Sequence, residues 1–197
     1  MGSSRGDRVR IRKRTVSETE TRRLAASGAV AGLCPTTEAN LGDGLFPLKA
    51  YLDAGGRIGI GSDSHISVSA VEELRWLEYG QRLVTRHRNI SASRASPHTG
   101  DNLLRLALAG GAQASGIDTG ALKAGARADF VVLDDESPLL AGRDAADVID
   151  TWIFAGNANL VRDVVVAGEP VVRDCRHRDE ERIAARYREV VARLARG

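Results

Sequence analysis

The sequence predicts an α/β fold, in which parallel strands alternate with helices and a smaller antiparallel β region follows. Two short apolar runs, at 29–34 and 58–61, are typical of buried strands, and leucines at helical spacing lie between them. Strand, helix and strand within about thirty-five residues form a βαβ unit, whose strands are parallel. A third observation concerns residues 128–172, where valine-rich runs flank a glycine turn and indicate antiparallel pairing.

The first region contains four expected helices and two expected strands. Ser17 and Glu20 form a capping box, which starts the first helix. The expected elements, in chain order, are helix 17–26, strand 29–34, a helix from Leu45 that ends before Gly55, strand 58–61, helix 71–88 and helix 101–114. Asp101 is the expected cap of the last helix, and polar loops are expected at 36–44 and 89–100.

The second region is expected to be rich in β-strands and to end in a helix. Residues 128–134 predict a strand, and 164–167 and 171–172 predict a hairpin whose turn is led by Gly168. Residues 179–196 carry apolar side chains along one side, which predicts an amphipathic helix.

Composition describes an ordinary globular chain of 197 residues, 43% hydrophobic and 27% charged, with a net charge of +2. No apolar run is long enough to cross a membrane, and no segment resembles a signal peptide. Two cysteines are too few for a disulfide scaffold, so a cytoplasmic location is expected. The sequence has no phosphate-binding glycine motif, so nucleotide binding has no support.

The first fourteen residues are strongly basic, with six basic residues against one aspartate. A solvated, poorly ordered arm is the favoured interpretation, and a phosphate-binding arm is the alternative. Because no aromatic residue is interleaved for base stacking, a nucleic-acid partner is not expected.

Asp63 is the strongest candidate for chemistry, because it directly follows a buried, glycine-rich strand. A carboxylate there can bind zinc and can move a proton between water and a leaving amine. Capping of the next turn is an equally weighted structural role. His65, two residues further, is a candidate substrate contact, although spacing alone favours a histidine that faces water.

Glu38 and Asn40 lie after the preceding strand and are candidate substrate-binding residues at the same mouth. Loop residues of this kind more often satisfy backbone groups. Cys34 is interpreted as a small core residue, because no histidine partner can be assigned to it.

Two stretches are specific enough to identify a resemblance. The stretches GLCPTTEANLGDG and GSDSHISVSAVEELRWLEYGQR resemble the amidohydrolase superfamily, and within it the formimidoylglutamate deiminases of histidine degradation. The later stretches GALKAGARADFVVLD and VRDVVVAGEPVVRD resemble the C-terminal part of the small β-sandwich in the same superfamily. The resemblance extends over about residues 17–193.

The resemblance implies a (β/α)8 barrel that holds one divalent metal, usually zinc. It makes Asp63 the aspartate of the eighth strand, a metal ligand and proton shuttle, and 30–34 the seventh strand. The implied reaction is hydrolysis of N-formimidoyl-L-glutamate to N-formyl-L-glutamate and ammonia.

The chain departs from the family pattern in its metal ligands. The H-x-H pair of the first strand, the histidine of the fifth strand and the helper histidine of the sixth have no counterpart, and Arg12-Lys13-Arg14-Thr15 stands where a histidine motif is expected. A complete barrel also needs roughly 250 residues. We therefore expect a C-terminal barrel fragment that does not hold zinc or catalyse the deiminase reaction alone.

These observations predict four segments: a basic arm at 1–16, a partial barrel at 17–115, a partial β-sandwich at 116–178 and a C-terminal helix at 179–197. Open barrel edges favour self-association or a complementing chain as partner. Two functional alternatives stay open: a non-catalytic remnant or interaction module that docks through its exposed barrel edge, and an amidohydrolase acting on another imine or an aminopurine.

Overall fold

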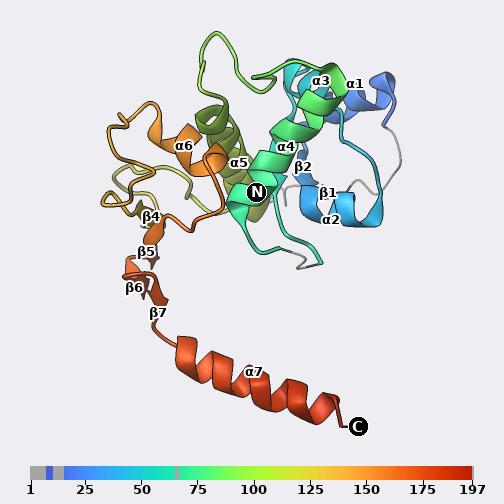
Figure 1. Ribbon diagram of the computed structural model, residues 1–197. Helices are drawn as coiled ribbons and strands as arrows, with labels where there is room; N and C mark the ends of the chain where they lie inside the picture. The colour runs from blue at the N-terminus through green and yellow to red at the C-terminus, as the bar shows by residue number, and fades with distance from the viewer. Residues whose placement is uncertain (1–7, 11–15, 65–66, 197) are drawn as a thin grey trace.

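The computed structural model describes residues 8–10, 16–64 and 67–196. Figure 1 shows a sheet-and-helix body, a small second sheet beside it, and a last helix that extends away from both. The mixed α/β class predicted from the sequence is confirmed.

The first sheet is parallel and has three strands in the order β1-β2-β3. Strands β2 (Val30–Leu33) and β3 (Arg57–Ile60) form the predicted βαβ unit, with Val30 opposite Arg57. Strand β1 (Arg8–Arg10) pairs with the other edge of β2. The expectation of an arm without structure at 1–16 is therefore wrong at these three residues, because pairing satisfies backbone groups that β2 would otherwise expose. Residues 1–7 and 11–15 lie outside the described residues.

Five helices accompany this sheet in the described chain: α1 (Glu18–Ala26), α2 (Pro35–Leu41), α3 (Leu48–Asp53), α4 (Ala70–Thr85) and α5 (Thr99–Ser115). The predicted capping box of α1 is confirmed. The amide of Ser17 donates to Glu20 Oε2 at 2.9 Å, and the amide of Glu20 donates to Ser17 Oγ at 3.3 Å.

Two local predictions in this region are wrong. The segment expected to be a polar loop at 36–44 is largely helix α2, because Pro35 occupies its first turn and Gly42, at φ 70°, ends it in the left-handed conformation. Helix α5 begins before Asp101, with His98 at the N-cap, and Asp101 instead accepts from Arg105 Nε at 2.7 Å.

The core lies between the first sheet and helices α3, α4, α5 and α6 (Val148–Phe154). A Cβ on Gly110 of α5 would stand 1.8 Å from the carbonyl oxygen of Ile58 in β3, so only glycine allows this close approach. Tyr51 of α3 is fully buried, and its hydroxyl donates to the carbonyls of Ala29 and Arg57, each at 3.2 Å. The largest buried apolar side chains are Leu33, Leu48, Tyr51, Ile58, Leu74, Leu103 and Ile153.

The second sheet is antiparallel, in the order β4-β5-β6-β7. Its strands are β4 (Phe130–Leu133), β5 (Val161–Val166), β6 (Glu169–Arg173) and β7 (Arg176–His177). The predicted hairpin is present, but Ala167 leads the turn at φ 53° and Gly168 follows at φ 84°. The amide of Ala167 donates to Asp129 Oδ1 at 2.7 Å, which holds alanine in this conformation.

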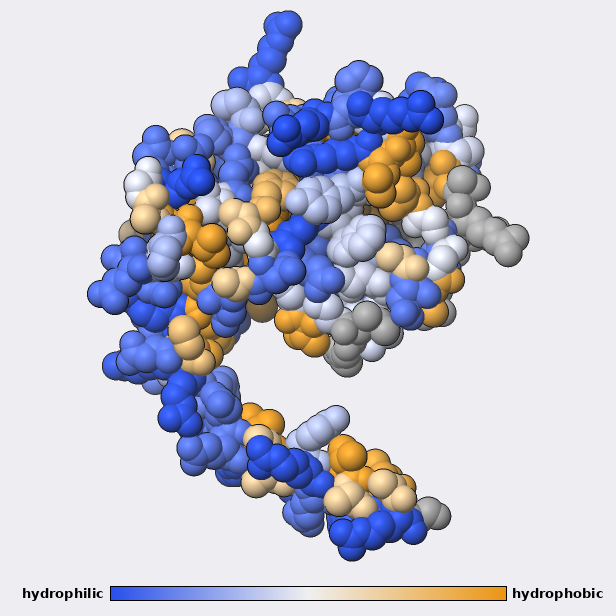
Figure 2. Space-filling model, viewed as in Figure 1, coloured by the Kyte–Doolittle hydropathy of each residue, from blue (hydrophilic) through white to orange (hydrophobic). Residues whose placement is uncertain are grey.

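Helix α7 (Glu180–Leu194) confirms the predicted C-terminal helix and buries none of its residues. Figure 2 shows apolar side chains along one side of it, and Ile183, Tyr187 and Leu194 are exposed. None of the helices in the described chain is long and apolar enough to span a bilayer.

Candidate functional site at the strand ends

The carboxyl ends of β2 and β3 meet at one edge of the first sheet. The two strands stay paired to their last residues, Leu33 and Ile60, and the amide of Gly61 donates to the Leu33 carbonyl at 3.0 Å. The residues that follow each strand are therefore neighbours, as the predicted βαβ unit requires.

Thr37 of α2 connects the two strand ends. Its hydroxyl donates to the carbonyl of Ser62 at 2.9 Å and accepts from the amide of Ser64 at 3.2 Å. Asp63 lies between these two serines, with φ 46° and an exposed side chain. The tight turn leaves Asp63 exposed at this edge of the sheet.

Glu38 lies in the first turn of α2 and faces the same edge. Its Oε1 accepts from the amide of Cys34 at 2.9 Å. Burial raises the pKa of Glu38, and the neighbouring carboxylates of Glu73, Asp43 and Asp63 raise it further, while the Cys34 amide opposes the shift. Asp63 and Glu38 follow the carboxyl ends of two paired strands, so both lie at this edge of the sheet.

Glu73 of α4 is buried behind this edge, with 1% of its surface exposed. It accepts hydrogen bonds from the amide of Thr36 at 3.0 Å and from the hydroxyl of Thr36. Burial raises the pKa of Glu73, and the two hydrogen bonds from Thr36 oppose the shift. The contact fixes the start of α2, and with it Thr37 and Glu38, against α4.

The other predicted site residues have different outcomes. Asn40 is exposed, two residues beyond Glu38 on α2, and residues at this spacing do not share a helix face. Helix geometry therefore separates Asn40 from Glu38. Asn40 and Glu38 both lie on a helix instead of the expected loop. His65 lies outside the described residues.

Sequence reasoning missed Thr36, Thr37 and Glu73 as positioning residues. A signal for Glu73 was present, because it lies four residues before Leu77, on the apolar side of α4. An acidic residue on a buried helix face needs a polar partner. The partner itself is 37 residues away in sequence, and no local pattern specifies it.

The described residues do not form a complete metal site. Within 8–10, 16–64 and 67–196, no group of three or more histidine, cysteine, aspartate or glutamate residues is arranged to hold a metal ion. Catalytic zinc takes about three protein ligands. Glu38 also lines a small pocket of about 20 Å³, which is room for about one water molecule and not for a substrate.

A parallel sheet with carboxyl groups at its strand ends is the arrangement in which barrel enzymes build their sites. The sequence profile of the amidohydrolase family matches residues 9–171. The chain belongs to the amidohydrolase family.

Individual relatives agree with this membership. The chain is 56% identical over 171 residues to a formimidoylglutamate deiminase from Pseudomonas aeruginosa, a match that covers 87% of this chain and 38% of that protein. This amidohydrolase chain thus spans less than two fifths of the length of that relative.

Solved structures of amidohydrolases share the fold. An amidohydrolase from Brucella melitensis superposes with a TM-score of 0.83 at 43% identity, over 92% of this chain and 40% of the other. Atrazine chlorohydrolase from Arthrobacter aurescens, a structure complexed with zinc, gives 0.72 at 27% identity, over 91% of this chain and 39% of the other.

Proposed function

We propose that this chain forms the C-terminal part of a (β/α)8 barrel amidohydrolase that hydrolyses N-formimidoyl-L-glutamate to N-formyl-L-glutamate and ammonia. The observation that carries the proposal is the 56% identity to a formimidoylglutamate deiminase. Since 171 of the 197 residues are matched, the match includes the strand-end segment that carries Asp63.

Asp63 is the proposed catalytic residue, and Glu38 and His65 are proposed to contact the substrate, whereas Asn40 lies on another side of α2 from Glu38 and is not included. In the reaction, the oxygen of water bonds to the formimidoyl carbon, and the bond from that carbon to the terminal nitrogen breaks. Asp63 transfers both protons of the water to that nitrogen in turn, the first as water adds to the carbon and the second from the new hydroxyl as the carbon–nitrogen bond breaks, so that ammonia leaves and a formyl group remains. Its exposed position at the strand end, held by Thr37, supports this role.

The zinc-containing neighbour supports a metal in the complete site. The described residues do not supply the ligands that such a metal needs. We therefore propose that residues outside this chain complete the site, and that the chain alone is inactive.

The test is ammonia release from N-formimidoyl-L-glutamate with zinc present. The chain is assayed alone and after mixing with the part of the Pseudomonas aeruginosa relative that precedes the matched region. We expect no turnover by the chain alone and turnover by the mixture. Asp63→Asn should abolish turnover, whereas Asp53→Asn, which changes an exposed aspartate paired with Lys49 on α3, should leave it intact.

Turnover by the chain alone would refute the proposed incompleteness. A mixture that forms a stable complex but releases no ammonia would refute the deiminase assignment. Adenosine, assayed beside it, tests the aminopurine alternative.

A docking role is the second candidate, because β1 and β3 are edge strands of the described sheet. A complex that turns over neither substrate would favour it. In that case Asp63→Asn would leave complex formation unchanged.

A further inference from the structure

A second polar site is a pocket lined by α4, by α6 and by the segment that joins α4 to α5. It is a pocket of about 310 Å³, near the lower limit for small-molecule sites. Helix α4 is about 24 Å long, and its first turn contacts the strand-end site while its last turn lines this pocket. The pocket is thus separate from the site around Asp63.

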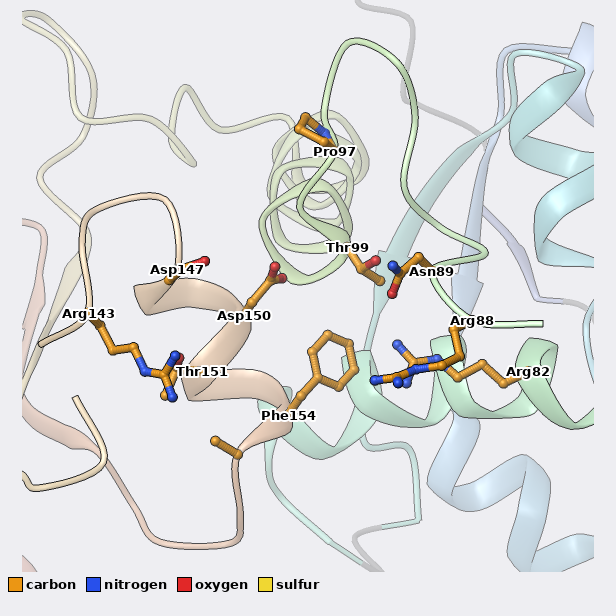
Figure 3. A pocket seen from close by; sticks show the side chains of 11 residues that line it. Arg82, Arg88, Asn89, Pro97, Thr99, Arg143, Asp147, Asp150, Thr151 and Phe154 are labelled. Atoms are coloured by element: carbon orange, nitrogen blue, oxygen red, sulfur yellow. The ribbon is translucent and has the colours of Figure 1, made fainter. Parts of the chain in front are cut away.

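Three arginines line this pocket from two sides. Figure 3 shows Arg82 and Arg88 reaching toward Phe154 from one side, and Arg143 beside Thr151 on the other. The positive charge is therefore divided between two poles, with the apolar ring of Phe154 between them.

Arg82 is held firmly in place. Its Nε donates to Glu78 Oε1 at 2.8 Å, and its guanidinium carbon lies 5.2 Å from the ring centroid of Phe154 and 5.3 Å from that of Tyr79. The two rings stack on each other with their centroids 5.8 Å apart. A fixed guanidinium loses little freedom when it binds an anion.

Asp150, one of the two aspartates that line the pocket, already has hydrogen-bond partners. Asp150 accepts from the amide of Gly100 and lies 3.2 Å from His98 Nδ1, so it caps the start of α5. Asp147 lies 3.8 Å from the same histidine nitrogen.

The cations are less fully satisfied. Among the described residues, the exposed side chains of Arg88 and Arg143 have neither a hydrogen bond nor an ion pair. Two guanidinium groups that have no acceptor among the described residues, beside an Asp150 carboxylate that is already hydrogen-bonded, favour an anionic ligand.

We propose that this pocket binds a small organic dicarboxylate, with one carboxylate on the side of Arg82 and Arg88 and the other at Arg143. The volume and the two charged poles fit a short dianion with an apolar middle. The strand-end residues take no part, so the proposal does not depend on the deiminase assignment.

The test is isothermal titration of the full chain with glutarate, a five-carbon dicarboxylate. We expect saturable binding of one glutarate per chain. Arg88→Gln and Arg143→Gln should each weaken binding about tenfold or more, because each removes a charge-assisted hydrogen bond. The matched control is Arg94→Gln, which changes an exposed arginine of the same connecting segment outside the pocket and should leave binding unchanged.

Three further outcomes bear on the proposal. Weaker binding of butyrate, which carries one carboxylate, would support the two-pole arrangement. Inorganic phosphate that binds more tightly than glutarate would overturn the dicarboxylate assignment. Absence of saturable binding, or equal loss in all three variants, would overturn the site itself. Circular dichroism of each variant confirms that the chain remains folded in these comparisons.

Discussion

Two glutamates on α4 are both buried, but their pKa values are shifted in opposite directions. Glu73 and Glu78 lie five residues apart and are 1% and 0% exposed. Burial acts to raise the pKa of both. Glu73 has neutral donors from Thr36 and keeps a raised pKa. At Glu78, hydrogen bonds from Arg82, Ile90 and Ser91 outweigh burial and hold the pKa below its usual value.

The difference shows that the number and charge of the hydrogen-bond donors, together with burial, decide the direction in which the pKa of a carboxyl group in this helix is shifted. At its first turn α4 contributes to an acidic site with protonatable groups. Toward its last turns, a negative charge is fixed and used to orient an arginine into a pocket.

The largest expected effect on this comparison comes from Glu78→Gln. The amides of Ile90 and Ser91 donate to Oε1 and Oε2 at 2.9 Å each, so the glutamine NH₂ would meet a donor. Arg82 would also lose its charged partner. We expect the free energy of unfolding, measured by urea denaturation, to fall by about 3 kcal/mol. A loss below about 1 kcal/mol would mean that Glu78 is not a charged anchor.

Glu73→Gln is the matched variant and should lower the free energy of unfolding by less, about 1 kcal/mol or below. Glutamine can accept from the Thr36 amide through its oxygen and donate to the Thr36 hydroxyl through its nitrogen, since a hydroxyl both donates and accepts. The same urea experiment measures it. A cost equal to that of Glu78→Gln would show that Glu73 is needed as an anion, contrary to its raised pKa.

Local sequence signals predicted the elements that depend on neighbours in the chain. Ser17 and Glu20 are three residues apart and specify the start of α1 without any tertiary contact. The apolar runs of β2 and β3 are likewise recognisable from local sequence, and their predicted parallel pairing is confirmed.

Contacts between residues that are far apart in the chain were not predicted from the sequence. Thr37 reaches the serines on both sides of Asp63 across 25 and 27 residues, and Glu73 reaches Thr36 across 37. Helix α2 was missed because its seven residues contain two threonines and an asparagine, which favour turns, and its stability depends on these tertiary bonds. The arginine pocket joins residues 82 to 155 and has no sequence signature.

Glu73 and Glu78 should also give the stability of the chain opposite dependences on pH. Because Glu73 binds its proton more tightly in the folded chain, its stabilisation is complete below pH 4.5 and is lost as pH rises through the folded pKa. For Glu78 the sign is reversed: its stabilisation is complete above pH 4.5 and is lost as pH falls through the folded pKa. We measure the urea midpoint of unfolding across this pH range for the unmodified chain and for each variant. In Glu73→Gln the midpoint should fall less than in the unmodified chain as pH rises. In Glu78→Gln it should fall less than in the unmodified chain as pH is lowered. Identical profiles in both variants would contradict the opposite shifts.

Arg88→Gln should have the smallest effect on stability, within about 0.5 kcal/mol of the unmodified chain. Arg88 lines the same pocket as Arg82, but among the described residues its side chain has no hydrogen bond or ion pair to lose. Arg82 is held by Glu78, so the two arginines differ in how far the fold depends on them. The free energy of unfolding in urea, with and without glutarate, separates the two roles. Loss of the glutarate-induced stabilisation without loss of basal stability would show that Arg88 serves the ligand and not the fold. A large basal loss would mean instead that Arg88 is a structural cation like Arg82.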